Sequence, residues 1–145
     1  MNETRLQMLM DRMDITDTII RYATSVDTCD WELFLTCYTD DIEMDMTSIG
    51  FDKPLNMPAK EFLEIIKQAV SPFDSTQHIV SNHVVKINGD NAECISYLQA
   101  QHFRQDETGV HTLTIGGYYS NSYIRTPKGW RISKYKVTKT WMTTT

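Results

Sequence analysis

Three tight-turn signals divide the second half of the chain into four strand-like segments. The first, Asn88-Gly89-Asp90, is a strong hairpin signal because Asn and Gly tolerate the left-handed backbone that short hairpin loops require. Turn residues also occupy 105–109 and 126–129. The segments between these turns are rich in β-branched and aromatic residues, and they cover residues 77–87, 92–104, 110–125 and 130–141. Short turns join antiparallel strands, so the sequence predicts a four-stranded antiparallel meander.

The first half of the chain has helical periodicity instead. A first helix is expected over about residues 3–25, and Asp30 can cap a short second helix. The apolar face of that second helix comprises Trp31, Phe34, Leu35 and Tyr38. Residues 39–41 are expected to form a turn, and residues 42–46 alternate as a half-buried strand does. Helices that precede strands in this way are typical of the α+β class.

A loop and a third helix complete the first half. Residues 50–58 are expected to form a loop punctuated by Pro54 and Pro58. Pro58 suits the first turn of a helix, and the apolar stripe that follows comprises Phe62, Ile65, Ile66 and Ala69. We therefore expect a single α+β domain over residues 1–145, with the helices packed on one face of a curved antiparallel sheet.

The adjacent glycines Gly116 and Gly117 fall in the middle of a predicted strand, where glycine weakens strand propensity. A sharp bend in a strongly curled sheet would explain them. Such a sheet, closed on one side by the helices, predicts a cone-shaped half-open barrel with an internal cavity.

The first helix carries a row of residues that ends on a carboxylate. Met13, Ile20 and Asp27 are seven residues apart, which places them on roughly one face, and Leu6, Leu9 and Ala23 extend that face. We expect this row to face the core. Because burying a lone carboxylate is costly, Asp27 is either solvated at the helix end or meets a donor inside the domain.

Strand periodicity groups polar residues with apolar ones on single faces of the predicted sheet. In the first strand the row comprises His78, Val80, Asn82 and Val84; in the second it comprises Ala92, Cys94, Ser96, Leu98, Ala100, His102 and Arg104. In the third it comprises His111, Leu113, Ile115, Gly117, Tyr119, Asn121, Tyr123 and Arg125. Rows that run from apolar to polar are typical of a pocket with a few converging polar groups. From the pattern alone, His78 is by default a surface histidine of an edge strand, as Asp27 is by default a solvated helix end.

Composition excludes several classes of function. A net charge of −5 argues against a nucleic-acid binder that neutralises phosphates. No apolar segment follows the N-terminus and none is long enough to cross a membrane, so we expect a cytoplasmic protein without membrane contact. The three cysteines lack the spacing of a metal or redox motif. Nucleotide and zinc motifs are also missing, so no cofactor or metal is expected.

The stretch from Tyr22 to Trp31 resembles the Tyr-x-x-x-x-Asp-x-x-Asp-Trp opening of the SnoaL-like family in the nuclear-transport-factor-two-like superfamily. Residues 76–82 are similar to the family's His-x-x-x-Asn strand, and Gly116-Gly117 with Gly129-Trp130 are similar to its last hairpin. The resemblance covers about residues 15–141. It implies the half-open barrel described above.

The resemblance extends to cofactor-free lyases of the family, namely scytalone dehydratase, hexachlorocyclohexane dehydrochlorinase and bile-acid dehydratase. It implies an Asp–His pair formed by Asp27 and His78, and a second active-site histidine at His102. The two water-holding tyrosines of scytalone dehydratase would fall on Val26 and Met46, which argues against scytalone as the substrate.

The remaining substrate contacts are expected from the strand rows and the family motifs. An arginine of the dehydrochlorinase falls near Arg125, and the family's opening tyrosine is Tyr22. His102, Tyr119 or Asn121 could supply the hydrogen bond to a developing oxyanion or a departing hydroxide.

The expected function is proton abstraction by His78, supported by Asp27, from a small hydrophobic molecule. Dehydration or a related elimination, isomerisation and cyclisation all begin with this step, and the substrate could be a polyketide, terpenoid or steroid. The alternatives are a non-catalytic ligand-binding or assembly domain of the same fold and, third, a small subunit of an aromatic-ring dioxygenase. We also expect a homo-oligomer, with a trimer favoured over a dimer.

Overall fold

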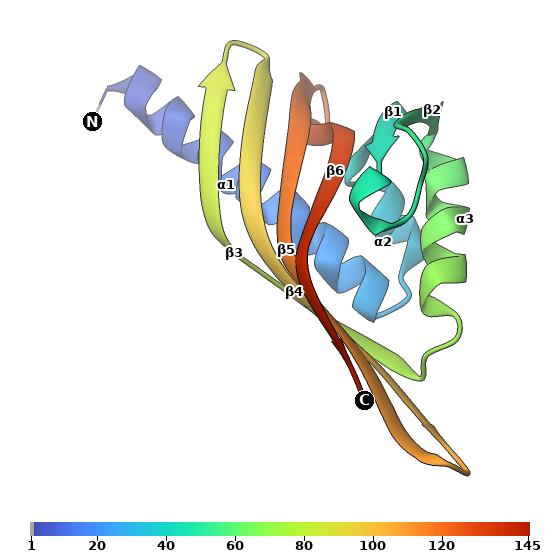
Figure 1. The fold of residues 1–145 in the computed structure, drawn as a ribbon. Helices are drawn as coiled ribbons and strands as arrows, with labels where there is room; N and C mark the ends of the chain where they lie inside the picture. The colour runs from blue at the N-terminus through green and yellow to red at the C-terminus, as the bar shows by residue number, and fades with distance from the viewer. Residues whose placement is uncertain (1) are drawn as a thin grey trace.

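The computed structural model describes residues 2–145 and places three helices and a short 3-10 helix against one curved, unclosed sheet (Figure 1). The helices are α1 (Glu3–Asp27), α2 (Trp31–Leu35), η1 (Thr47–Ile49) and α3 (Ala59–Val70). The strands are β1 (Tyr38–Asp45), β2 (Leu55–Pro58), β3 (Ser75–Asn88), β4 (Asn91–Asp106), β5 (Gly109–Thr126) and β6 (Gly129–Thr144). The expected α+β class, with helices packed on a curved half-open sheet, is confirmed.

The four C-terminal strands form the meander that the turn signals predict. Each of the three connections is a two-residue hairpin loop, because Asn88 pairs with Asn91, Asp106 with Gly109, and Thr126 with Gly129. Gly89 has a φ of +62°, which explains glycine at this turn. Helix α1 crosses one face of these strands (Figure 1).

Two further strands extend the sheet, which has the order β2-β1-β6-β5-β4-β3 within residues 2–145. Strand β1 runs parallel to β6, and β2 pairs antiparallel with β1. The expected turn at 39–41 is therefore wrong, because these residues and Tyr38 belong to β1. The expected loop over 50–58 likewise contains β2.

The buried face of α1 differs from the expected one. Met13 and Ile20 are 65% and 42% exposed, so the row that ends on Asp27 does not face the core. The residues that do are spaced four, three and four apart: Ile15, Ile19, Tyr22 and Val26. The same face also buries Asp11 and Thr18, which find partners in Trp130 on β6. These two polar residues make the true core face look polar in the sequence.

Gly116 and Gly117 lie where the pairing of β5 with β6 is irregular. A Cβ added to Gly116 would overlap the Trp141 indole, and one added to Gly117 would overlap the Thr138 carbonyl oxygen. The pairing between β5 and β6 shifts by one residue at this point. The glycines thus allow the close approach and bend that their position in the strand predicted.

A bulge in β3 changes which residues face inward. The pairing with β4 shifts between Ser81 and Val84, and Asn82 has a φ of +53°. Beyond the bulge His83, rather than Asn82, turns inward, and its Nδ1 lies 2.7 Å from the Ser96 hydroxyl. The expected row is therefore correct for His78 and Val80 and wrong beyond them.

Candidate active site

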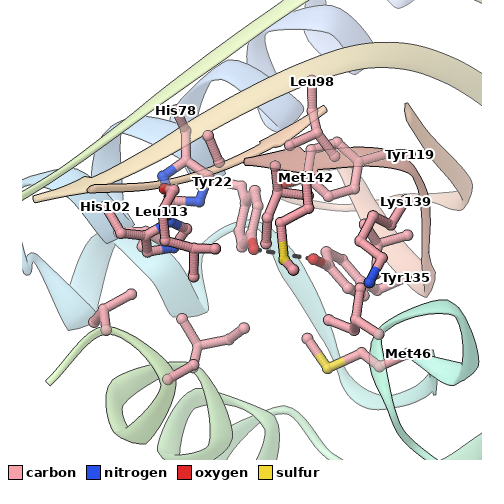
Figure 2. A pocket seen from close by; sticks show the side chains of 18 of the residues that line it. Tyr22, Met46, His78, Leu98, His102, Leu113, Tyr119, Tyr135, Lys139 and Met142 are labelled. Atoms are coloured by element: carbon pink, nitrogen blue, oxygen red, sulfur yellow. Dashed lines mark hydrogen bonds between the residues drawn. The ribbon is translucent and has the colours of Figure 1, made fainter. Parts of the chain in front are cut away.

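A cavity of about 330 Å³ lies between the sheet and the helices α1 and α3 (Figure 2). Most of its wall is apolar, which suits a small hydrophobic molecule. The polar side chains that line it are those of Tyr22, His78, His102, Tyr119, Tyr135 and Lys139.

Asp27 and His78 meet at one end of this cavity. Asp27 is the last residue of α1, which stops there because Cys29 adopts a left-handed φ of +53°. A carboxylate at a helix C-terminus is disfavoured by the helix dipole and needs donors from elsewhere. Strand β3 supplies them, since His78 Nδ1 lies 2.7 Å from Asp27 Oδ1. The His78 side chain is 9% exposed and that of Asp27 is 20% exposed.

Two more hydrogen bonds hold the carboxylate. The backbone N–H of His78 donates to Asp27 Oδ2 at 2.7 Å, and the Thr76 hydroxyl donates to Asp27 Oδ1 at 2.9 Å. Burial on its own would raise the pKa of Asp27, but the hydrogen bonds from His78 and Thr76 outweigh it and lower that pKa. The aspartate is therefore ionised, and it accepts the Nδ1–H of His78. In the neutral form of that ring, Nε2 would then carry the lone pair.

His102 stands next to His78, with ring centroids 5.9 Å apart and the rings nearly perpendicular. Its Nδ1 lies 3.2 Å from the Leu113 carbonyl oxygen, which can only accept, so Nδ1 carries the proton. Burial lowers the pKa of His102 below the ordinary histidine value. Neutral His102 thus offers an acceptor at Nε2, not the donor that was expected for an oxyanion.

Hydroxyl donors come from three tyrosines at the middle of the cavity. The Tyr22 hydroxyl lies 3.3 Å from that of Tyr135, and the Tyr119 ring packs against both, at 5.8 Å from Tyr22 and 5.4 Å from Tyr135. Burial raises the pKa of Tyr22 and Tyr119 well above the usual range and that of Tyr135 to about 12. All three therefore keep their protons and can donate them in hydrogen bonds.

Sequence reasoning missed Tyr135 and Lys139 because of a second bulge. Simple alternation from Trp130 and Ile132 would turn Lys134 inward, but the pairing with β5 shifts after Ile132. The inward set then becomes Tyr135, Val137 and Lys139. The signal in the sequence for this inward-facing set was that two apolar residues, Tyr135 and Val137, occupy odd-numbered positions of the strand.

Two of the expected substrate-binding residues lie outside the cavity. Asn121 uses its side-chain oxygen to accept from the backbone N–H of Lys136 at 3.1 Å, which fills the irregular part of the β5–β6 ladder. Arg125 makes a double hydrogen bond to Asp11 at 2.6 and 2.8 Å, bonds Asp90 at 3.0 Å and stacks on Trp130. All three of its guanidinium nitrogens therefore donate to carboxylates that join α1 to the hairpins. Asn121 and Arg125 thus make contacts within the fold and do not line the cavity where substrate contacts were expected.

No group of three or more histidine, cysteine, aspartate or glutamate side chains could hold a metal ion within residues 2–145. Cys37 and Cys94 are buried and Cys29 is exposed, and all three are free thiols. None of the helices in the described part of the chain combines the length and apolar character that crossing a membrane needs.

Comparison with known proteins places these observations in a family. A SnoaL-like domain model matches residues 7–136. An uncharacterized Mycobacterium tuberculosis protein is 26% identical over 90% of this chain and 86% of its own length. A Kribbella flavida protein of known structure is 27% identical, with a TM-score of 0.87 over 92% of this chain and 93% of that one.

Two solved structures with names that point to lyases share the fold. A Novosphingobium aromaticivorans protein proposed to be a scytalone dehydratase is 17% identical, with a TM-score of 0.78 over 99% of this chain and 91% of that one. A hexachlorocyclohexane dehydrochlorinase of Novosphingobium barchaimii is 19% identical, with a TM-score of 0.81 over 97% and 94%. At these identities the likeness shows the fold alone. The domain match over most of the chain shows more: this chain belongs to the SnoaL-like domain family.

Proposed function

We propose that this protein is a cofactor-independent lyase or isomerase in which His78 removes a proton from a small hydrophobic substrate. The observation that carries the proposal is the 2.7 Å contact between His78 Nδ1 and Asp27 Oδ1 at the wall of an apolar cavity. A carboxylate on Nδ1 fixes the tautomer that leaves Nε2 as the base, and it stabilises the imidazolium that forms. Fold neighbours with dehydratase and dehydrochlorinase names agree with this class.

The reaction begins at a carbon next to an activating carbonyl. His78 Nε2 takes the proton, the C–H electron pair moves into a new C=C bond, and the carbonyl oxygen gains negative charge. In an elimination the enolate expels hydroxide or another leaving group, which departs with its electron pair. In an isomerisation the imidazolium returns the proton to a different carbon. One base can serve either outcome.

The tyrosines are placed to stabilise the oxyanion. Tyr22, Tyr119 and Tyr135 line the cavity, and they are protonated donors. Donors that are already oriented in a buried site stabilise developing charge more than water does, because they need not reorganise. We assign the oxyanion contact to this cluster rather than to His102.

A panel of small cyclic β-hydroxyketones and unsaturated ketones in D₂O tests the proposal. Mass spectrometry follows loss of water, and NMR follows deuterium uptake next to the carbonyl. His78→Ala should lower the rate by roughly 10²–10⁴-fold. The matched control His83→Ala removes an imidazole that does not line the cavity, and it should leave the rate within about twofold of wild type.

Equal rates for wild type and His78→Ala would show that His78 is not the base. Ligands that bind without exchange or conversion by wild type would favour the non-catalytic binding domain instead.

A further inference from the structure

Lys139 is the one lysine or arginine among the cavity-lining residues of the described chain. It is half-buried on β6, and the cavity that it lines is also lined by Met46, Ile49, Val137 and Met142. Inward-facing lysines in an apolar cavity are rare, because an ammonium group loses hydration there. The position of Lys139 in this cavity therefore needs a chemical explanation.

The backbone at this point is held in place. The N–H of Lys139 donates to the Ser48 hydroxyl at 2.6 Å, which ties β6 to η1. Lys139 pairs with Gly117, and the one-residue shift beside it keeps the following Met142 directed into the cavity. The lysine thus extends from a fixed strand rather than from a loose end.

No carboxylate lies within 4 Å of the Lys139 ammonium among residues 2–145. On the same strand Lys134 has one, with Glu43 at 2.7 Å. Figure 2 shows Lys139 beside Tyr135 and Met46, across the cavity from His78 and His102. The carboxylate of Asp27 contacts His78 at that far end. The cavity thus has a base at one end and an unneutralised cation at the other.

We propose that the natural substrate is a small, largely apolar acid whose carboxylate binds Lys139 while its reacting carbon faces His78. The ammonium group would replace part of the carboxylate's hydration, and the apolar wall would select the rest of the molecule. This inference rests on the proposed function, because it takes His78 as the group that meets the reacting carbon.

Binding of 2-naphthoate and of its uncharged isostere 2-naphthamide tests the inference by calorimetry at pH 8, where imidazoles are ordinarily neutral. Wild type should bind naphthoate roughly tenfold more tightly than naphthamide, as expected for one charge-assisted hydrogen bond. Lys139→Met should abolish that preference without weakening naphthamide, which would also show that the cavity is intact. Lys136→Met, on the same strand and outside the cavity, should keep it.

Three results would overturn the inference: equal affinities in wild type, a preference that survives in Lys139→Met, or no binding of either compound. The proposed function is judged separately, because these measurements need no turnover. His78→Ala should retain the preference for naphthoate. If wild type converts uncharged ketones but shows no preference for the acid, the role of His78 as the base is supported and the role of Lys139 is refuted.

Discussion

Asp27 and His78 are joined twice, because the carboxylate accepts one hydrogen bond from the ring Nδ1–H and another from the backbone N–H of the same residue. The first bond fixes the tautomer, and the second fixes the position of β3 against the end of α1. The ring therefore cannot turn away from the cavity without breaking a contact between two elements. Substituting either residue tests a different part of this arrangement.

Asp27→Asn should keep the fold and lower kcat by roughly 10²–10⁴-fold. The amide can still accept from the His78 backbone, but it cannot stabilise an imidazolium as a carboxylate does. The rate is measured on whichever panel ketone wild type converts. Asp30→Asn is the control, because Asp30 caps α2 through the Leu33 N–H and Asn caps equally well. Full activity of Asp27→Asn would exclude a catalytic role for the carboxylate.

Tyr135→Phe should lower kcat by about 10²–10³-fold with a small change in KM, if its hydroxyl stabilises the oxyanion. The ring and its packing remain, so the fold should hold. Tyr38→Phe provides the comparison, because Tyr38 is equally buried, lies outside the cavity, and its hydroxyl has no hydrogen-bond partner within residues 2–145. Similar kcat values for Tyr135→Phe and wild type would remove Tyr135 from the mechanism.

Arg125→Met should destabilise the protein by about 1–3 kcal/mol while leaving ligand affinity unchanged. The buried carboxylate of Asp11 would lose two of its hydrogen bonds. Urea unfolding gives the stability, and naphthamide binding gives the affinity. Arg104→Met, at the exposed pair with Asp106, should change stability much less. Weaker naphthamide binding by folded Arg125→Met would instead support the substrate-binding role that the sequence predicted for Arg125.

The meander could be predicted from the sequence because its signals are local. Two-residue loops and strand alternation are visible within short windows, and the glycines at 116–117 mark the bend. The parallel pairing of β1 with β6 joins residues about ninety positions apart, and no local pattern reports it. Thr39-Asp40-Asp41 therefore resembled a turn.

The site was predictable to a similar extent. The family motif predicts the Asp27–His78 pair, whereas the helical row of Met13, Ile20 and Asp27 does not face the core as expected. The phase of β3 and β6 changes at bulges, at Asn82 and near Ser133, and alternation cannot be followed through them. For that reason strand alternation does not predict that Tyr135 and Lys139 face the cavity. Alternation also predicts that Asn121 lines the cavity, whereas its side-chain oxygen accepts a hydrogen bond from the backbone N–H of Lys136 beside a bulge.

Stability should fall as the pH drops below the ordinary histidine value of about 6.5. Burial lowers the pKa of His102 and of His83 in the folded protein, so the unfolded chain binds protons that the folded one does not. These two histidines therefore do not affect the free energy of unfolding above that pH, and they lower it as the pH falls below it. Urea unfolding at several pH values between 5 and 7.5 gives the free energy of unfolding as a function of pH. This free energy should fall less steeply towards low pH in His102→Gln, and less steeply still when His83→Gln is added. An unchanged slope in the double variant would contradict this assignment.

We propose, finally, that the chain forms a homo-oligomer through the outer face of β3 and β4. Four large apolar side chains are exposed there, Ile79, Val84, Ile95 and Tyr97. Val84 pairs with Ile95, Tyr97 with Ser81 and Ile79 with Gln99, so the four lie close together on the outer face of two adjacent strands. A contiguous exposed apolar surface is a common mark of an interface.

Light scattering at micromolar concentration should give an oligomer for wild type, with a trimer expected, and a monomer for the double variant Ile95→Lys, Tyr97→Lys. Charges placed on the outer face would oppose association, while the inner face of β4, which lines the cavity through Leu98, Ala100 and His102, stays unchanged. Glu93→Lys with Gln99→Lys, on the same face of the same strand but without loss of apolar surface, is the control for added charge. A wild-type monomer, or an oligomer that survives the Ile95 and Tyr97 substitutions, would place the interface elsewhere or show that none exists.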